Sequence, residues 1–144
     1  MPENRVATAS VTIDASRERV WAALTDPDLI KQYMFGSTVT SDWTVGSTIT
    51  YAGEYEGKRY EDHGTILEIT PRRLLRLTHF SPLGGLPDVP ENYHTITYTL
   101  RGEVGGTRLE LTQDNNASDA EAEHSAANWK QMLEGLKSVV ESTP

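Results

Sequence analysis

Hydrophobic and polar residues follow two different periods along this sequence, one typical of helices and one typical of strands. Over residues 118–141, apolar side chains recur at three- and four-residue spacing, which predicts one long amphipathic helix. Over residues 5–14, apolar and polar side chains alternate, which predicts a half-buried strand. The inward face of that strand would carry Ala7, Ala9, Val11 and Ile13.

The predicted long helix has a defined start and a face whose side chains grow larger along its length. Ser118 and Glu121 have the spacing of a capping box, in which a hydroxyl and a carboxylate bind free backbone N–H groups. The small side chains of Ala122, Ser125 and Ala126 are followed by the bulkier Trp129, Met132, Leu133, Leu136 and Val140. Laid across a curved sheet, this helix would leave a cavity beside its small half. The alternative is that alanine lets the helix sit closer to the sheet.

Two short helices and a run of strands are predicted between these segments. Ser16 would cap the first helix, and Asp26 followed by Pro27 would start the second. Strands are predicted over residues 37–40, 47–52, 58–70, 74–80, 93–101 and 107–113, with hairpin turns at Glu56-Gly57 and Gly105-Gly106. After a short polar tail over residues 1–4, this order predicts an α+β fold. We expect a single domain over residues 1–144, with an antiparallel sheet of about seven strands and helices on one side.

Two features of the strand region leave alternatives open. Gly64 interrupts the strand at 58–70 and indicates a bulge or bend. Either the odd-numbered residues, with Leu67, or the even-numbered residues, with Ile66, would then face inward. Residues 81–92 contain three prolines and two glycines, which exclude regular structure. A loop of this kind is either a binding loop or a plain tether.

Composition and charge narrow the range of functions. The formal net charge is −8, whereas nucleic acids and anionic membranes require a basic surface. The absence of cysteine excludes disulfides, thiol catalysis and cysteine-ligated zinc. No stretch approaches the ~20 apolar residues of a membrane helix, and residues 1–10 lack the apolar core of a signal peptide. We therefore expect a cytoplasmic protein that neither binds nucleic acid nor inserts into membranes.

Several segments together resemble a known family. Residues 11–27, VTIDASRERVWAALTDP, resemble the opening signature of the START-like, or SRPBCC, superfamily. Residues 64–71, 96–100 and 129–133 are similar to the central strands, last hairpin and terminal helix of its branch related to the activator of heat-shock-protein ATPase. The resemblance implies a helix-grip fold: a curved antiparallel sheet of about seven strands around a long C-terminal helix, with two short helices after strand one. It also implies a cavity for an apolar or amphipathic ligand. Here residues 33–36, YMFG, replace the family's frequent Trp-rich run, so the shape of the ligand does not carry over.

Histidines and tyrosines are the candidate functional residues. None of the four histidines has a paired metal-ligand spacing, and no nucleophile elbow or phosphate-binding glycine loop is present, so we expect no metal and no other cofactor. His63 and His79 lie on strands that could be neighbours, where Asp62 could supply a carboxylate partner. The simpler interpretation of each histidine is a surface residue or one with its hydrogen bonds satisfied. The simpler interpretation of the acidic residues around the 56–57 turn is a solvated sheet edge. Tyrosines suit either an apolar pocket with polar anchors or an ordinary sheet core.

The leading hypothesis is binding of a small hydrophobic or amphipathic molecule between the sheet and the long helix, with the 81–92 loop near the mouth. The ligand-binding residues would be Tyr51, Leu67, Leu77, His79, Tyr98, Trp129 and Met132. One alternative is a small cyclase- or hydrolase-like enzyme, which a buried histidine–carboxylate pair opening onto the pocket would favour. Another is a protein-interaction module of the co-chaperone type, with a chaperone or a second copy of the chain as partner. The eukaryotic co-chaperone has an additional N-terminal domain without a counterpart in this sequence.

Overall fold

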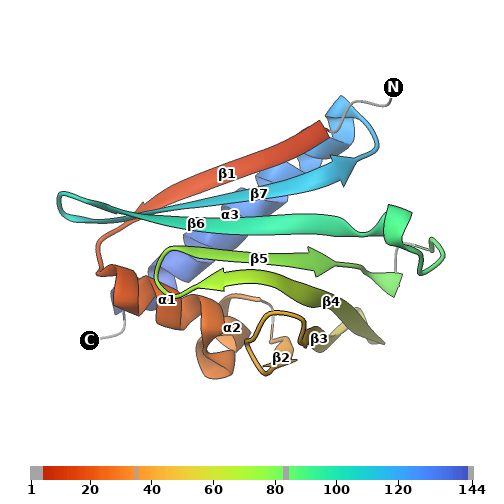
Figure 1. Ribbon diagram of the computed structural model, residues 1–144, viewed down its shortest axis with the longest axis horizontal. Coiled ribbons are helices and arrows are strands. Elements are labelled where there is room, and N and C mark those ends of the chain that lie inside the picture. The colour runs from red at the N-terminus through yellow and green to blue at the C-terminus, as the bar shows by residue number, and fades with distance from the viewer. Residues whose placement is uncertain (1–4, 35, 83–84, 143–144) are drawn as a thin grey trace.

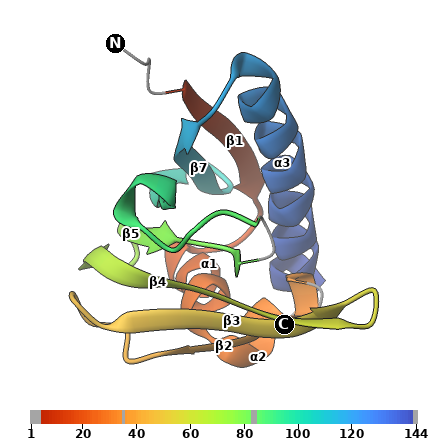
Figure 2. The same cartoon turned by 90° about the vertical axis from the view of Figure 1, so that its right-hand side faces the viewer.

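Seven antiparallel strands form one curved sheet, and a long helix lies against its concave side (Figures 1 and 2). The computed structural model describes residues 5–34, 36–82 and 85–142. The strand order is β1-β7-β6-β5-β4-β3-β2. The strands are β1 (Arg5–Ile13), β2 (Thr38–Ser41), β3 (Thr48–Tyr55), β4 (Lys58–Thr70), β5 (Leu74–His79), β6 (His94–Glu103) and β7 (Gly106–Asn116). The helices are α1 (Arg17–Thr25), α2 (Pro27–Tyr33), α3 (Asp119–Ser142) and the short 3-10 helix η2 (Pro90–Asn92).

This architecture confirms the predicted α+β helix-grip fold. Figure 2 shows β2, β3 and β4 turned away from β1 and β7, so that the sheet curves around the space beside α3. Most predicted strand boundaries differ from the observed ones by one to three residues; β3 continues to Tyr55, β7 continues to Asn116 and β5 ends at His79. Phe80 still forms an isolated bridge with His63. The expected polar tail over residues 1–4 lies outside the described residues.

Local sequence signals define the short elements as expected. The Ser16 hydroxyl accepts a hydrogen bond from the Arg19 backbone N–H at 3.3 Å, which caps α1. The Asp26 carboxylate accepts from the Asp28 backbone N–H at 2.9 Å, with proline in the first turn of α2. At the β3–β4 hairpin, Glu56 and Gly57 both have positive φ, 51° and 80°, as a tight two-residue turn requires.

Helix α3 begins with the predicted capping interactions and lies along β1. The Ser118 hydroxyl accepts from the Glu121 backbone N–H at 3.1 Å, and the Glu121 carboxylate accepts from the backbone N–H of Ala117. At its other end, the α3 backbone carbonyl of Val140 accepts from the Arg19 guanidinium at 2.5 Å. Contacts with β1, β7, α1 and α2 complete the packing of the helix.

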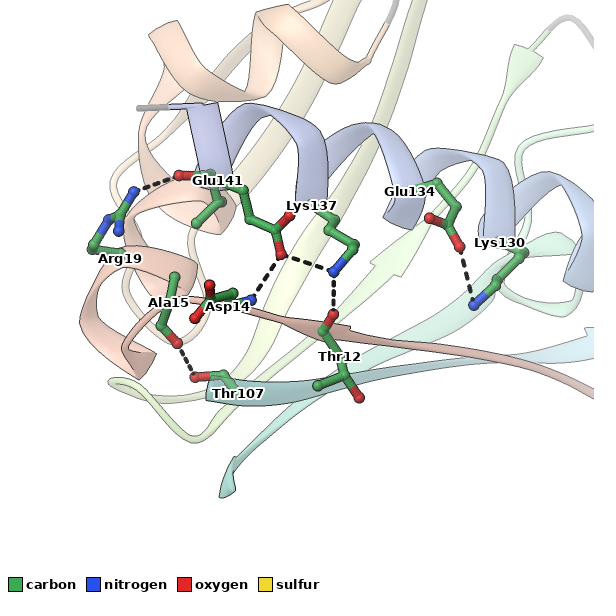
Figure 3. A network of polar contacts seen from close by, with 10 residues as sticks. Thr12, Asp14, Ala15, Arg19, Thr107, Lys130, Glu134, Lys137 and Glu141 are labelled. Atoms are coloured by element: carbon green, nitrogen blue, oxygen red, sulfur yellow. Dashed lines mark hydrogen bonds and ion pairs between the residues drawn. The ribbon is translucent and has the colours of Figure 1, made fainter. Parts of the chain in front are cut away.

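Side chains of α3 also cover the open edge of β1, which ends the sheet and lies next to β7 (Figure 3). Lys137 Nζ donates to the Thr12 carbonyl at 2.7 Å, and Lys130 Nζ donates to the Ser10 carbonyl at 2.6 Å. The Glu141 carboxylate accepts from the Asp14 backbone N–H at 2.8 Å. These contacts satisfy edge groups that would otherwise be available for pairing with another strand.

The inward register of β4 is set by a bulge that follows Ile66. Ile66 lies opposite Leu77, whereas Glu68 lies opposite Arg76, so that Leu67 is the extra residue of β4. Ile66 is fully buried, while Leu67 is 43% exposed. The expectation that Leu67 faces the pocket is therefore wrong, because Leu67 lies on the outer side of the sheet.

The hydrophobic core occupies one end of the space beneath the sheet. Its largest fully buried side chains are Ile13, Ile49, Ile66, Leu75, Leu77, Ile96, Leu109, Leu111, Leu133 and Leu136. On α3, buried residues begin only at Met132. The first half of α3 therefore adds little to the core, and space remains between its middle and the sheet.

Candidate functional site

A cavity of about 360 Å³ lies between the concave face of the sheet and the middle of α3. Strands β3 to β7 each contribute at least one lining residue, and α3 and the end of α2 close the other side. The aromatic and aliphatic lining residues are Met34, Tyr51, Tyr60, Ile96, Tyr98, Trp129 and Met132. The polar lining residues are Ser37, Asp62, His79, Gln113, Ser125 and Asn128. A mostly apolar wall with a few polar groups is typical of small-molecule sites.

Asp62 and His79 form a hydrogen-bonded pair in the cavity wall. His79 Nε2 lies 3.2 Å from Asp62 Oδ2, and the two side chains are only 20% and 18% exposed. In the neutral imidazole, Nε2–H donates to the carboxylate, which leaves Nδ1 as the unprotonated nitrogen. The second carboxylate oxygen, Asp62 Oδ1, is buried without a hydrogen-bond partner. The pair thus leaves one acceptor of Asp62 unused.

Two tyrosines line the cavity together with this pair, on the inward face of the sheet. Tyr51 lies directly opposite Asp62 on the neighbouring strand, and its ring meets the His79 ring edge-on at 5.8 Å. Burial raises the pKa of the Tyr51 hydroxyl well above its ordinary value, and the charges of Tyr98 and Asp62 raise it further. Burial likewise raises the pKa of Tyr98. Both hydroxyls are therefore neutral at ordinary pH and can donate or accept a hydrogen bond.

Two further polar contacts fix the remaining walls. On the α3 side, the Trp129 indole N–H donates to the Gln113 side-chain oxygen, which ties the helix to β7. At the α2 end, the hydroxyls of Ser37 and Tyr60 are 2.5 Å apart. These contacts hold the aromatic rings of Trp129 and Tyr60 at the cavity without using the Asp62–His79 pair.

Five of the seven expected ligand-binding residues line the cavity: Tyr51, His79, Tyr98, Trp129 and Met132. Leu77 faces inward as expected, but it is packed in the core and does not reach the cavity. Leu67 lies on the other side of the sheet. On α3 the cavity is lined by Ser125, Asn128, Trp129 and Met132, so that it lies beside the middle of the helix and not along its small first half alone.

Asp62, Tyr60 and Gln113 also line the cavity, although none of them is among the seven expected ligand-binding residues. Asp62 is the carboxylate partner of His79, as the sequence suggested for the strand histidines. The alternative of a solvated sheet edge holds for the exposed Glu61 but not for Asp62. The alternation along β4 was the available signal, since Tyr60 and Asp62 share the inward face with Ile66. Gln113 had no such signal, because a lone glutamine at a strand end is usually exposed.

His63 on β4 belongs to a separate cluster at the 81–92 loop. His63 Nε2 lies 3.0 Å from both Asp88 Oδ2 and the Tyr93 hydroxyl, and that hydroxyl donates to Asp88 Oδ1 at 2.5 Å. The Phe80 and Tyr93 rings stack beside them at 5.1 Å. This cluster fastens the loop to β4, and none of its residues lines the cavity.

Residues 5–34, 36–82 and 85–142 contain no group of three or more acidic or histidine side chains placed to hold a metal ion. In the same ranges, no helix is both long enough and apolar enough to cross a membrane.

The curved sheet, the long closing helix and the cavity between them define a helix-grip protein of the SRPBCC class. The chain belongs to the family of activator of Hsp90 ATPase homolog 1-like proteins, whose family model matches residues 14–141. The family resemblance seen in the sequence is thereby confirmed.

Solved structures share this fold. A Cytophaga hutchinsonii protein solved in solution is 52% identical, with 95% of this chain and 94% of its own covered and a TM-score of 0.84. The Aha1 dimer from Colwellia psychrerythraea is 23% identical, with 94% and 96% covered and a TM-score of 0.72. DynU16, from the dynemicin biosynthetic locus, is 19% identical, with 96% and 48% covered and a TM-score of 0.79. The last two likenesses show the fold alone. No curated protein matches this sequence significantly.

Proposed function

We propose that this protein binds a small, mostly apolar or amphipathic molecule in the cavity between the sheet and α3. The observation that carries the proposal is a hollow of about 360 Å³ in a largely aromatic and aliphatic wall. At about 30 Å³ per water-sized group, this volume corresponds to about twelve non-hydrogen atoms, the size of a substituted naphthalene. The polar groups in the wall would orient such a ligand.

Different residues of the cavity wall would make the apolar and the polar contacts with the ligand. Tyr98, Trp129 and Met132 supply apolar surface from both the sheet and the helix. Tyr51 and His79 place polar atoms beside that surface. Leu77 would support these residues from the core without touching the ligand.

Native mass spectrometry of the purified protein, followed by NMR titration with 2-naphthol, tests this proposal. We expect the indole N–H signal of Trp129 to shift on titration, because Trp129 lines the cavity. The indole signals of Trp21 and Trp43, which do not line it, serve as internal controls.

A matched pair of α3 variants completes this test. Ser125→Phe would fill the cavity and abolish the shift, whereas Ala127→Phe on the exposed face would retain it. No retained molecule, together with no Trp129 shift for any apolar probe, would rule out the proposal.

A second candidate function is acid–base catalysis, which the Asp62–His79 pair on the cavity wall favours. The unprotonated nitrogen of His79 could abstract a proton from a bound ketone, and solvent would return one. Exchange of the C1 protons of 2-tetralone in D₂O is a direct measurement of this step. We expect faster exchange with the wild-type protein than with His79→Gln. Equal rates would leave ligand binding as the function.

A protein partner is the third proposal. The Colwellia psychrerythraea protein is described as a dimer, and this description supports the proposal that this chain also forms a dimer. Size-exclusion chromatography with light scattering would measure it, and copurification would test a chaperone partner.

A further inference from the structure

We propose that the ligand presents a hydrogen-bond donor, a hydroxyl or an amine, to Asp62, and that the cavity selects against ligands that end in a carboxylate. This inference rests on the proposed function and names the chemical class of the ligand. It concerns only the end of the cavity formed by Asp62, His79 and Tyr51.

The unused oxygen of Asp62 is the first reason. Asp62 Oδ2 is held by His79, whereas Oδ1 is buried and has no partner. Burial of a carboxylate oxygen without a hydrogen bond is unfavourable, since the oxygen loses its hydration. A ligand O–H or N–H group at this point would restore the missing hydrogen bond, so that Asp62 is prepared for a donor.

The charge of the cavity wall is the second reason. Among the described residues that line the cavity there is no lysine and no arginine. His79 already directs Nε2 at Asp62. A ligand carboxylate would therefore lie beside a second anion without a counter-charge, which is strongly unfavourable away from water. Specificity would thus come from repulsion as well as from attraction.

The position of Tyr51 is the third reason. It lies directly opposite Asp62, and the charge of Asp62 is one of the causes that raise the pKa of its hydroxyl. The negative charge of Asp62 therefore acts on the part of the cavity wall formed by Tyr51. Tyr51 also lines the cavity, which places its side chain beside the same ligand group.

Four naphthalene probes that differ only at one end test the inference: naphthalene, 2-naphthol, 2-naphthylmethylamine and 2-naphthoate. At pH 7 we expect the wild-type protein to bind the naphthol and the amine at least about tenfold more tightly than the naphthoate. Asp62→Asn should weaken amine binding by about tenfold and reduce discrimination against naphthoate. Glu61→Gln, a charge-matched control on the exposed face of β4, should leave the order unchanged.

The outcomes separate this inference from the proposed function. Equal wild-type affinities for naphthoate and the amine would overturn the inference while leaving ligand binding intact, as would undiminished discrimination against naphthoate in Asp62→Asn. Failure of all four probes, naphthalene included, to shift the Trp129 indole signal would instead overturn the proposed function. The wild-type series decides the matter even if Asp62→Asn does not fold.

Discussion

At the residue scale, two glycines in regular elements have different surroundings. A Cβ atom on Gly64 would lie 1.7 Å from the Thr78 carbonyl oxygen on the neighbouring strand, a distance that no side chain can occupy. A Cβ atom on Gly135 in α3 would lie 3.5 Å from the Tyr33 Cβ, which is ordinary van der Waals contact. Gly64 is therefore required by close packing of β4 against β5, whereas Gly135 is not required by space.

Alanine substitution should separate the two positions. Gly135→Ala should raise the free energy of unfolding by about 0.5–1 kcal/mol, because alanine favours the helix and restricts the unfolded chain. Gly64→Ala should lower it by about 1–3 kcal/mol or more, since the strands must move apart. Urea unfolding at neutral pH measures both. A destabilised Gly135→Ala variant would show that the contact with Tyr33 is tighter than its distance indicates.

At the element scale, α3 does more than cover the core, because it also protects the edge of β1. Lys137 binds the Thr12 carbonyl of β1, and Glu141 binds the backbone N–H of Asp14, the residue that follows β1 (Figure 3). Lys130 binds the Ser10 carbonyl of β1 in the same way. The opposite edge of the sheet is the short strand β2 of four residues. Both edges therefore have features that discourage pairing with another sheet.

The contact of Glu141 should make stability depend on pH. The Asp14 backbone N–H and then Lys137 lower the pKa of Glu141 below its ordinary 4.5. A lowered pKa in the folded state means that the stabilisation is complete above the unfolded value and is lost as pH falls through the folded value. Glu141→Gln should therefore be less stable than the wild type at pH 7, and the difference should shrink below about pH 4.

Urea unfolding at several pH values is the measurement for this prediction. Glu134→Gln is the control, because Glu134 pairs with Lys130 on the same helix without a contact to β1. A stability difference for Glu141→Gln that stays constant down to pH 3 would argue against the assignment.

At the scale of the whole molecule, the cavity results from an uneven distribution of bulk. The C-terminal half of α3 is anchored by the buried Leu133, Leu136 and Val140. The N-terminal half is held by polar contacts at the helix start, such as the ion pair of Arg5 with Asp119 at 2.9 Å. The helix is thus fixed at both ends without complete packing between its middle and the sheet. A hollow of this kind lowers the stability of the fold, because packing contacts are missing, but it provides space for a ligand. Functional sites commonly have this cost in stability.

The sequence by itself determined the elements and their order. Alternation in β1, capping by Ser16, Asp26 and Ser118, and the left-handed turn at Glu56-Gly57 depend on neighbouring residues only. Periodicity and helix capping depend on residues that are close together in the sequence. The elements could therefore be predicted from the sequence alone. The size gradient of α3 also indicated a hollow, although not its full extent.

The tertiary structure decided which side chains share the hollow. The bulge after Ile66 places Leu67 outside, and the pairing of β3 with β4 places Asp62 opposite Tyr51. The pairing of β4 with β5 brings Asp62 to His79, and the packing of α3 against β7 brings Gln113 to Trp129. These neighbours come from different strands, and a shift of one residue in any register would exchange inward for outward side chains. Such a register depends on packing across the whole sheet, which no single segment specifies.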